Sequence, residues 1–260
     1  GQFAEALEAV EKITDAPANE LLQQELSFIK AFASARISLT SGEITAKDAG
    51  KQVKSFLSKY PDSFHTYPAI EQYGLLIYSF GNLEAAANEF AKLQKSDWLE
   101  YKLKGYFWRG RMLSLLGKSD AAASDFAAIL AETGTDDFTK HYQKLAACLK
   151  AREQGIGGDV EGGLAKLNQI RQQEGHANSQ LFAYTYNSLG VLHEQQGNLK
   201  QASVDYLHTP LLFGIESDAH AEALFRLSQL WPKLGKPGRA NEARQELQAR
   251  FRNSYWARNL

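Results

Sequence analysis

The chain has 260 residues, of which 44% are hydrophobic and 23% charged, and it contains 6 prolines. This composition excludes an intrinsically disordered chain and fits a folded protein. The formal net charge of -1 argues against a nucleic-acid platform, because such proteins usually carry a basic excess that neutralises phosphates. The longest apolar segment is interrupted by polar residues, so we expect no direct membrane insertion.

The residue types predict helices throughout. Ala, Leu, Gln, Glu, Lys and Arg dominate the sequence, and alternating runs of β-branched residues do not occur. The first group loses little conformational freedom in a helix, whereas strands favour the second. We therefore predict an all-α fold.

One stretch shows the organisation of the chain most clearly. Residues 186–209, YNSLGVLHEQQGNLKQASVDYLHT, contain a helix, a turn and a second helix. Leu189, Gly190 and His193 lie three to four residues apart on one helical face, and Gly197 interrupts this period. The period resumes after the glycine, so two antiparallel helices joined by a tight turn are predicted.

This stretch resembles a tetratricopeptide repeat. The family pattern has a small residue in the first helix, a Gly or Asn in the turn, and then an Ala and an aromatic residue in the second helix. Gly190, Gly197, Ala202 and Tyr206 occupy these four places. The resemblance implies that the paired helices approach closely at Gly190 and Ala202, while Tyr206 fills the gap toward the next pair.

The pattern recurs along the chain. Candidate turn glycines are separated by 39, 36, 41, 39 and 38 residues, which exceeds the roughly 34 of the strict family. These glycines are Gly42, Gly81, Gly117, Gly158, Gly197 and Gly235. The resemblance therefore implies a right-handed α-α superhelix, a TPR-like solenoid of about six helical hairpins plus a leading helix. The turn at Gly42 is expected to be about two residues longer than the pattern.

We expect a single domain over residues 1–260. Its approximate repeats are a half repeat at 1–14, full repeats at 18–59, 66–95, 98–133, 136–174, 178–213 and 217–251, and the start of a truncated helix at 254–260. Gly1 is interpreted as a turn glycine or a cleavage scar. Because a lone amphipathic helix cannot bury its apolar face, the half repeat indicates either a parent protein that continues upstream or a helix that caps the array in an atypical way.

Two segments depart from the pattern. Gly163 stands where Ala is usual, at a cost of roughly 1 kcal/mol in helix propensity, so we expect local looseness in the fifth repeat. Residues 210–214, PLLFG, form an apolar ending that we expect to pack under the next helix.

The sequence predicts no catalytic, metal or cofactor site. No histidine pair has metal-ligand spacing; the histidines are His65, His141, His176, His193, His208 and His220. Cys148, the single cysteine, lies on an apolar helical face and is interpreted as a buried structural thiol. The glycine cluster at 155–163 lacks the Gly-Lys-Ser/Thr ending of a phosphate loop, and Asp136 is interpreted as a helix cap. We therefore predict that the protein is not an enzyme.

The resemblance implies a concave groove lined by the first helices of successive hairpins. Carrying the family register over nominates the following partner-binding residues: Phe32, Arg36, Glu71, Leu75, Tyr78, Lys104, Phe107, Arg111, Tyr184, Asn187, Val191, Glu194, Phe225 and Gln229. Aromatic and Arg side chains suit the capture of an extended peptide or a partner helix. The alternative is that several of them, especially Phe32 and Phe225, belong to the core between repeats. The densest aromatic cluster comprises Trp98, Tyr101, Tyr106, Phe107 and Trp108.

The resemblance implies a noncatalytic scaffold that binds a protein or peptide partner in this groove. Two alternatives stay open: a regulatory or docking domain of a longer enzyme or sensor, and a self-associating assembly module whose incomplete terminal repeats pair into a homo-oligomer. Junctions such as Tyr60-Pro61-Asp62-Ser63 are similar to those of bacterial cell-envelope members of the superfamily, which favours the envelope or periplasm over the cytoplasm.

Overall fold

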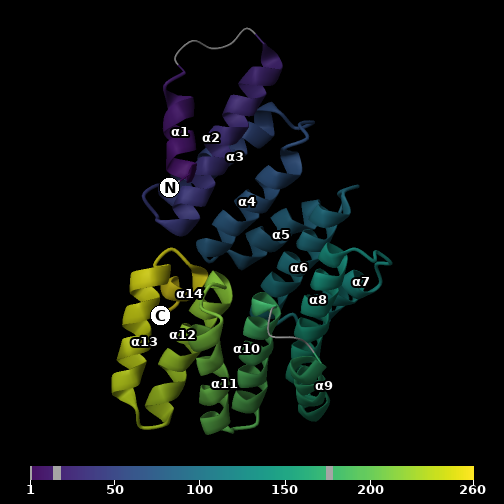
Figure 1. Cartoon of the computed structure of the whole chain (residues 1–260), viewed down its shortest axis with the longest axis vertical. Helices are drawn as coiled ribbons and strands as arrows, with labels where there is room; N and C mark the ends of the chain where they lie inside the picture. The colour runs from purple at the N-terminus through teal and green to yellow at the C-terminus, as the bar shows by residue number, and fades with distance from the viewer. Residues whose placement is uncertain (1, 14–18, 174–177) are drawn as a thin grey trace. The chain divides into compact units, whose positions relative to one another are not determined.

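The computed structural model describes residues 2–13, 19–173 and 178–260. In this part of the chain all regular structure is helical, in fourteen helices (Figure 1). The turn expected at Gly1, the repeat boundaries at 14 and 18 and at 174, and His176 lie outside the described residues. The helices are α1 (Gln2–Glu11), α2 (Glu20–Thr40), α3 (Ala46–Lys59), α4 (Thr66–Ser79), α5 (Leu83–Leu93), α6 (Leu99–Leu115), α7 (Ser119–Leu130), α8 (Asp137–Ile156), α9 (Val160–Gln173), α10 (Ser179–Gln195), α11 (Leu199–Leu212), α12 (Ser217–Lys233), α13 (Pro237–Phe251) and α14 (Tyr255–Arg258).

The chain divides into two compact units, residues 1–112 and 113–260, with the boundary inside α6. In the N-terminal unit α2 packs on α3 and α4 packs on α5, and α1 packs on α2. In the C-terminal unit the packed hairpins are α8 with α9, α10 with α11 and α12 with α13. Each pairs helices that are consecutive in sequence, as an all-α helical-repeat fold requires. The predicted all-α repeat fold is confirmed.

The six glycines predicted to form turns are the described residues with positive φ: Gly42 (φ 71), Gly81 (φ 91), Gly117 (φ 71), Gly158 (φ 118), Gly197 (φ 76) and Gly235 (φ 71). A residue with a Cβ adopts this left-handed region only at a cost, which explains why glycine recurs there. At the last five, the amide that follows the glycine donates to the carbonyl five residues earlier, as Asn198 does to His193 at 2.9 Å. This bond closes the exposed end of the first helix.

The distance from each glycine to the next helix also follows the sequence. The second helix begins two residues after the glycine in the last five turns, as Leu199 does after Gly197. After Gly42 the next helix begins four residues later, at Ala46. The prediction of a turn about two residues longer at Gly42 is confirmed.

Side-chain caps fix the starts of several helices. Asn19, Asn82, Asn178 and Asn198 accept hydrogen bonds from backbone amides in the first turns of α2, α5, α10 and α11. Asp136 accepts from the amide of the third residue of α8 and caps it, as predicted. These oxygens pair with amides that have no partner within the helix.

The glycines inside the first helices allow close contact with aromatic rings. A Cβ on Gly74 would lie 2.6 Å from the Phe90 ring, and one on Gly190 would lie 2.6 Å from the Tyr206 ring. Tyr206 also belongs to a core cluster that includes Leu224 of the next hairpin. The ring therefore packs on the glycine of its own hairpin as well as toward the next pair.

Gly163 has a packing reason of its own. A Cβ there would lie 2.7 Å from the carbonyl oxygen of Ala151 and 3.1 Å from the Cα of Gly155. Helices α8 and α9 therefore approach with almost no side chain between their backbones. Gly163 is buried, and this contact explains its glycine better than the looseness expected from helix propensity.

The expectation that residues 210–214 pack under the next helix is partly wrong. Helix α11 continues through Pro210 to Leu212, and Leu211 and Leu212 are 73% and 66% exposed. Only Phe213 is buried, with its ring 5.6 Å from that of Phe182. Consecutive helical residues point in different directions, so one of the three faces the core and the other two do not.

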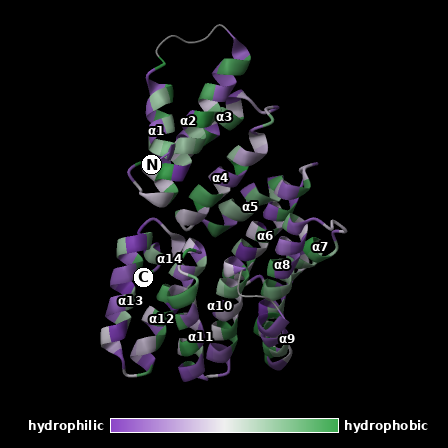
Figure 2. Cartoon of the chain, viewed as in Figure 1, coloured by the Kyte–Doolittle hydropathy of each residue, from purple (hydrophilic) through white to green (hydrophobic). Residues whose placement is uncertain are grey.

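Hydrophobic and hydrophilic residues alternate along most helices (Figure 2), the pattern expected where one face of a helix is buried. None of the described helices combines the length and the apolar character needed to cross a membrane.

Candidate interaction surface

Three residues predicted to line the groove come together in the N-terminal unit. Arg36, Glu71 and Lys104 lie on α2, α4 and α6, which are the first helices of consecutive repeats. The Lys104 Nζ donates to Glu71 Oε2 at 3.2 Å and to Glu100 Oε1 at 2.7 Å. The positive charge of Arg36 also acts on the Glu71 carboxylate. We call Arg36, Glu71 and Lys104 the charge row.

The charge row is only partly open to solvent. The side chains of Glu71 and Lys104 are 16% and 18% exposed. Burial raises the pKa of the Glu71 carboxyl, and the positive charge of Lys104 opposes this rise. Burial by itself would lower the pKa of Lys104, but the carboxylates of Glu71 and Glu100 outweigh it and the pKa is raised. Lys104 therefore stays charged and holds a carboxylate on each side.

Aromatic rings flank the charge row. The ring centroids of Tyr67 and Trp98 are 6.2 Å apart, those of Trp98 and Tyr101 5.9 Å, and those of Tyr67 and Tyr101 6.0 Å. The Lys104 Nζ lies 5.0 Å from the centre of the Tyr101 ring, within the range of a cation–π contact. Trp98 is 50% exposed. We call Tyr67, Trp98 and Tyr101 the aromatic group.

The sequence singled out Trp98 and Tyr101 but missed Tyr67 and Glu100. Tyr67 is more than thirty positions away from Trp98 in the chain, and only the pairing of repeats brings the two rings together. The repeat spacing could have found Tyr67, because it lies near the start of α4 as Tyr101 lies near the start of α6.

The other predicted residues of the N-terminal unit serve mainly its interior. Tyr78, Phe107 and Arg111 are buried, and Leu75 is half-buried. Phe32 is half-buried, with its ring 6.1 Å from that of Phe3 and 5.4 Å from that of Phe28. These ring contacts agree with the alternative that Phe32 belongs to the core between repeats.

In the C-terminal unit, two predicted residues join neighbouring hairpins. Tyr184 and Asn187 are buried on α10. The Asn187 Nδ2 donates to the carbonyl of Ala219 at 2.8 Å, and its Oδ1 accepts from Thr209 at 2.8 Å. The Tyr184 hydroxyl donates to Asp218 Oδ2 at 3.4 Å. The bonds to Ala219 and Asp218 fix α10 against α12, and the bond from Thr209 joins α10 to α11 of its own hairpin. Neither side chain is left with a free surface.

The remaining predicted residues of this unit keep some exposure. Val191, Glu194 and Phe225 are half-buried, and Gln229 is exposed. Glu194 accepts a hydrogen bond from the Tyr206 hydroxyl at 3.2 Å, and Phe225 packs on Trp256 with centroids 5.5 Å apart.

A buried ion pair in the same unit gave no signal in the sequence. The Arg152 Nη1 donates to Glu222 Oε1 at 2.9 Å, and the two side chains are 3% and 0% exposed. Seventy positions separate the partners. Glu153, which follows Arg152 in the sequence, accepts a hydrogen bond from Ser114 Oγ, thirty-nine positions away. Such pairs depend on which helices pack together, so a local sequence motif does not predict them.

The groups with reactive chemistry are engaged in packing. Cys148 is buried and its Sγ lies 3.4 Å from Thr185 Oγ1, as expected of a structural thiol. His193 Nδ1 lies 2.6 Å from Asp205 Oδ2. Over residues 2–13, 19–173 and 178–260, no three His, Cys, Asp or Glu side chains are placed to hold a metal ion.

Helical hairpins closed by left-handed glycines, with small residues under aromatic rings, define a helical-repeat fold of the tetratricopeptide type. The chain is similar in structure to a crystallised tetratricopeptide repeat protein from Parabacteroides merdae ATCC 43184, with a TM-score of 0.68 and 17% sequence identity. The match covers 96% of this chain and 87% of the other. No family model matches the sequence, and no curated protein matches it.

Proposed function

We propose that this protein is a noncatalytic scaffold that binds a segment of a protein partner along the first helices of its N-terminal unit. The observation that carries the proposal is the charge row, in which Lys104 pairs with Glu71 of the preceding first helix and the charge of Arg36 acts on the same carboxylate. Lys104 also contacts the ring of Tyr101, which packs against the half-exposed Trp98. Scaffolding is also the role most often found for tetratricopeptide folds, an analogy of fold and therefore weaker support than the site itself.

The charge row and the aromatic group offer complementary means of recognition. Large, half-exposed aromatic side chains act as anchors because burying them removes much apolar surface from water. Charges of alternating sign orient the partner and set its register. Lys104 is already held by two carboxylates, so little conformational freedom is lost when a ligand arrives.

The surface is narrower than the one predicted from the family register. In the N-terminal unit it comprises Arg36, Glu71, Leu75 and Lys104. Val191, Glu194 and Gln229 lie on first helices of the C-terminal unit and are not part of this proposal. Arg111 is 2% exposed, so reversing its charge would test folding more than binding.

The test begins with a displayed library of random peptides selected against the full chain. Affinities of the selected peptides are then measured for the wild type, Trp98→Ala and Lys104→Ala. We expect either substitution to weaken binding about tenfold, as removal of an anchor does. Lys150→Ala is the control, because Lys150 is exposed on α8 and is not part of this surface. Equal affinities for all four proteins would contradict the proposal.

Self-association is a second candidate, favoured by an exposed apolar patch in the C-terminal unit. Leu211, Leu212 and Ile215 are 73%, 66% and 81% exposed, and they lie close together in sequence at the end of α11. Contiguous exposed apolar residues commonly mark contact surfaces. Sedimentation at several concentrations tests this candidate, with Leu211→Ser/Ile215→Ser as the variant. A monomer at every concentration would rule it out.

A further inference from the structure

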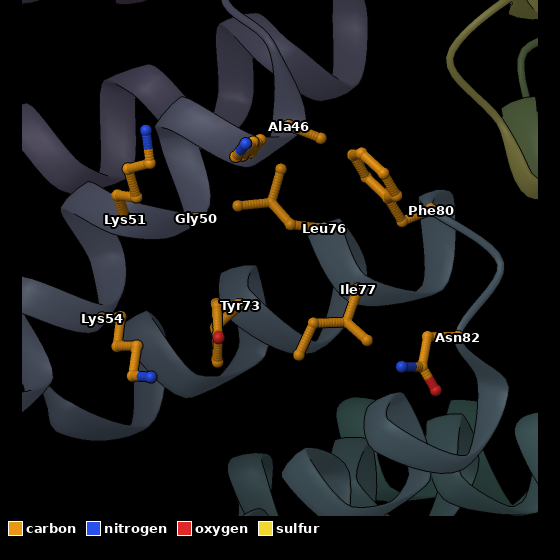
Figure 3. Close-up of a pocket in the computed structure, with 10 residues that line it drawn as sticks. Ala46, Gly50, Lys51, Lys54, Tyr73, Leu76, Ile77, Phe80 and Asn82 are labelled. Carbon is orange, nitrogen blue, oxygen red and sulfur yellow. The ribbon is translucent and has the colours of Figure 1, made fainter.

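A pocket of about 360 Å³ lies between α3 and α4 in the N-terminal unit (Figure 3). Its floor is apolar: Tyr73, Leu76 and Ile77 come from α4, and Ala46 and Gly50 come from α3. Gly50 leaves space that a side chain would otherwise fill, since a Cβ there would reach Tyr73 at 3.6 Å, an ordinary contact. The pocket is at the small end of the range for ligand sites, about 300–1,000 Å³.

Three lysines form one rim of the pocket. Lys47, Lys51 and Lys54 line it, and all three are exposed. Their spacing of four and three residues places them on one face of α3. The helix carries four lysines against a single aspartate, whereas the whole chain has a net charge of -1.

This concentration of positive charge does not serve the helix itself. Like charges three or four residues apart destabilise a helix by a few tenths of a kcal/mol for each pair. Asp48 Oδ1 forms an ion pair with Lys51 Nζ at 3.0 Å, which offsets part of this repulsion. No acidic residue is among the residues that line the pocket.

An exposed aromatic ring completes the opposite rim. Phe80 follows the end of α4 and is 53% exposed. In Figure 3, Lys51 and Lys54 lie on one side of the pocket and Phe80 lies on the other, with Leu76 between them. Apolar surface in a hollow and positive charge at its edge therefore occur together.

We propose that this pocket binds an acidic segment of a protein partner, which inserts one aromatic or branched aliphatic side chain between Tyr73, Ile77 and Phe80. Carboxylates on either side of that anchor would pair with Lys47, Lys51 and Lys54. Charge complementarity selects this occupant, because the rim carries three lysines and Asp48 offsets only part of their charge. A hollow lined by apolar side chains suits a single anchor better than the broad surface of a bilayer.

This lysine-rimmed pocket is separate from the charge row. Glu71 and Tyr73 lie on the same helix, but no residue of the charge row lines the pocket. The two sites therefore make independent predictions: Lys104→Ala should leave the pocket intact, and substitutions on α3 should leave the charge row intact. Failure of one proposal does not imply failure of the other.

The test uses synthetic peptides that carry a central phenylalanine flanked by glutamates, with matched peptides in which glutamine or lysine replaces the glutamates or alanine replaces the phenylalanine. Binding to the full chain is followed by fluorescence anisotropy. We expect only the peptide with both glutamates and phenylalanine to bind well, and we expect its affinity to fall as salt is raised.

Two variants separate charge from shape. Lys47→Glu/Lys51→Glu/Lys54→Glu should weaken binding of this peptide by about tenfold or more. The control, Lys95→Glu/Lys150→Glu/Lys200→Glu, changes the net charge equally at three exposed lysines outside the pocket and should change binding little. Gly50→Leu fills the pocket without altering charge and should also weaken binding. Circular dichroism and urea unfolding verify that each variant is folded.

Three results would overturn the proposal. The first is equal binding of the acidic peptide by the rim variant and its control. The second is no preference for the acidic, phenylalanine-containing peptide over its matched peptides. The third is lysine-dependent binding of phosphatidylserine vesicles without binding of any peptide, which would assign the surface to an anionic membrane instead.

Discussion

The ring of Tyr206 lies so close to Gly190 that a Cβ on the glycine would be 2.6 Å from Tyr206 Cε1. The ring is fully buried and its hydroxyl is bonded to Glu194, so it has little room to move. The identity of one residue in α10 therefore controls how closely α11 packs on it.

We expect Gly190→Ala to destabilise the protein by up to about 2 kcal/mol. Overpacking of a core costs about 1–3 kcal/mol, and the gain in helix propensity of roughly 1 kcal/mol offsets part of this cost. Gly238→Ala is the matched control, because Gly238 is helical and nothing lies within 4 Å of its Cβ position. Urea unfolding should show the control to be neutral or slightly stabilised. Equal stability of both variants would contradict the packing argument.

The turn glycines make a different prediction. Gly197 has φ 76 and open space around its Cβ position, so a substitution there meets backbone strain without a steric clash. We expect Gly197→Ala to reduce stability by about 1 kcal/mol and Gly197→Asn by less, because Asn tolerates the left-handed region better. The order of the two midpoints in thermal unfolding checks this. A midpoint for Gly197→Asn equal to or below that of Gly197→Ala would show that the left-handed backbone conformation is not the cause.

The buried ion pair predicts strong coupling between its members. We expect Glu222→Leu to cost about 3–5 kcal/mol, because the guanidinium of Arg152 loses the carboxylate that compensates its buried charge. The double variant Arg152→Met/Glu222→Leu should recover most of this loss, since it leaves neither charge in the interior. A double-mutant cycle by urea unfolding measures the coupling. Additive losses would show that the two side chains act separately.

His220 predicts a loss of stability in mild acid. Burial lowers the pKa of His220 from its ordinary value of 6.5, and Arg250 lowers it further, while Glu246 and the Gly214 carbonyl oppose the shift. Below pH 6.5 the unfolded chain therefore binds a proton that the folded chain does not, so stability falls as pH falls. The slope is at most about 1.4 kcal/mol for each pH unit, and it ends at the folded-state pKa.

The measurement compares unfolding free energies from pH 7 down to pH 5 for the wild type and His220→Gln. The variant should lose part of the pH dependence, because its side chain does not titrate. His208→Gln serves as the control, since His208 is only partly buried and stacks on Tyr186 with centroids 4.1 Å apart. Identical pH profiles for the wild type and His220→Gln would exclude His220 as the cause.

Much of the fold could be predicted because its determinants are local. Gly81 and Gly197 mark turns because the backbone there has a positive φ, which few other residues adopt. The interval between such glycines defines the repeat. Asp136 was assigned as a cap from its place before a helical segment, and the structure confirms it. These signals require no knowledge of neighbouring repeats.

The site depended on information that spacing does not contain. A helical register tells which residues share a face, yet Asn187 and Glu194 share one and differ in burial. Asn187 is buried and donates to the Ala219 carbonyl, whereas Glu194 is half-buried and pairs with the Lys233 ammonium at 3.4 Å. The lysine-rimmed pocket was missed for a related reason. In the sequence, Lys47 and Lys51 indicate only an ordinary solvent-exposed helix face. The structure shows that Tyr73 of α4 lines the same pocket.

The Arg152–Glu222 pair has a consequence for how the C-terminal unit comes apart. It links α8 to α12 across the intervening hairpin of α10 and α11, whereas repeats of this kind ordinarily contact only their immediate neighbours. Fraying of the last hairpin would break this ion pair, whose other member lies two repeats away. Separate unfolding of the terminal hairpin is therefore disfavoured. We expect the segment from α8 to α12 to unfold as one cooperative unit.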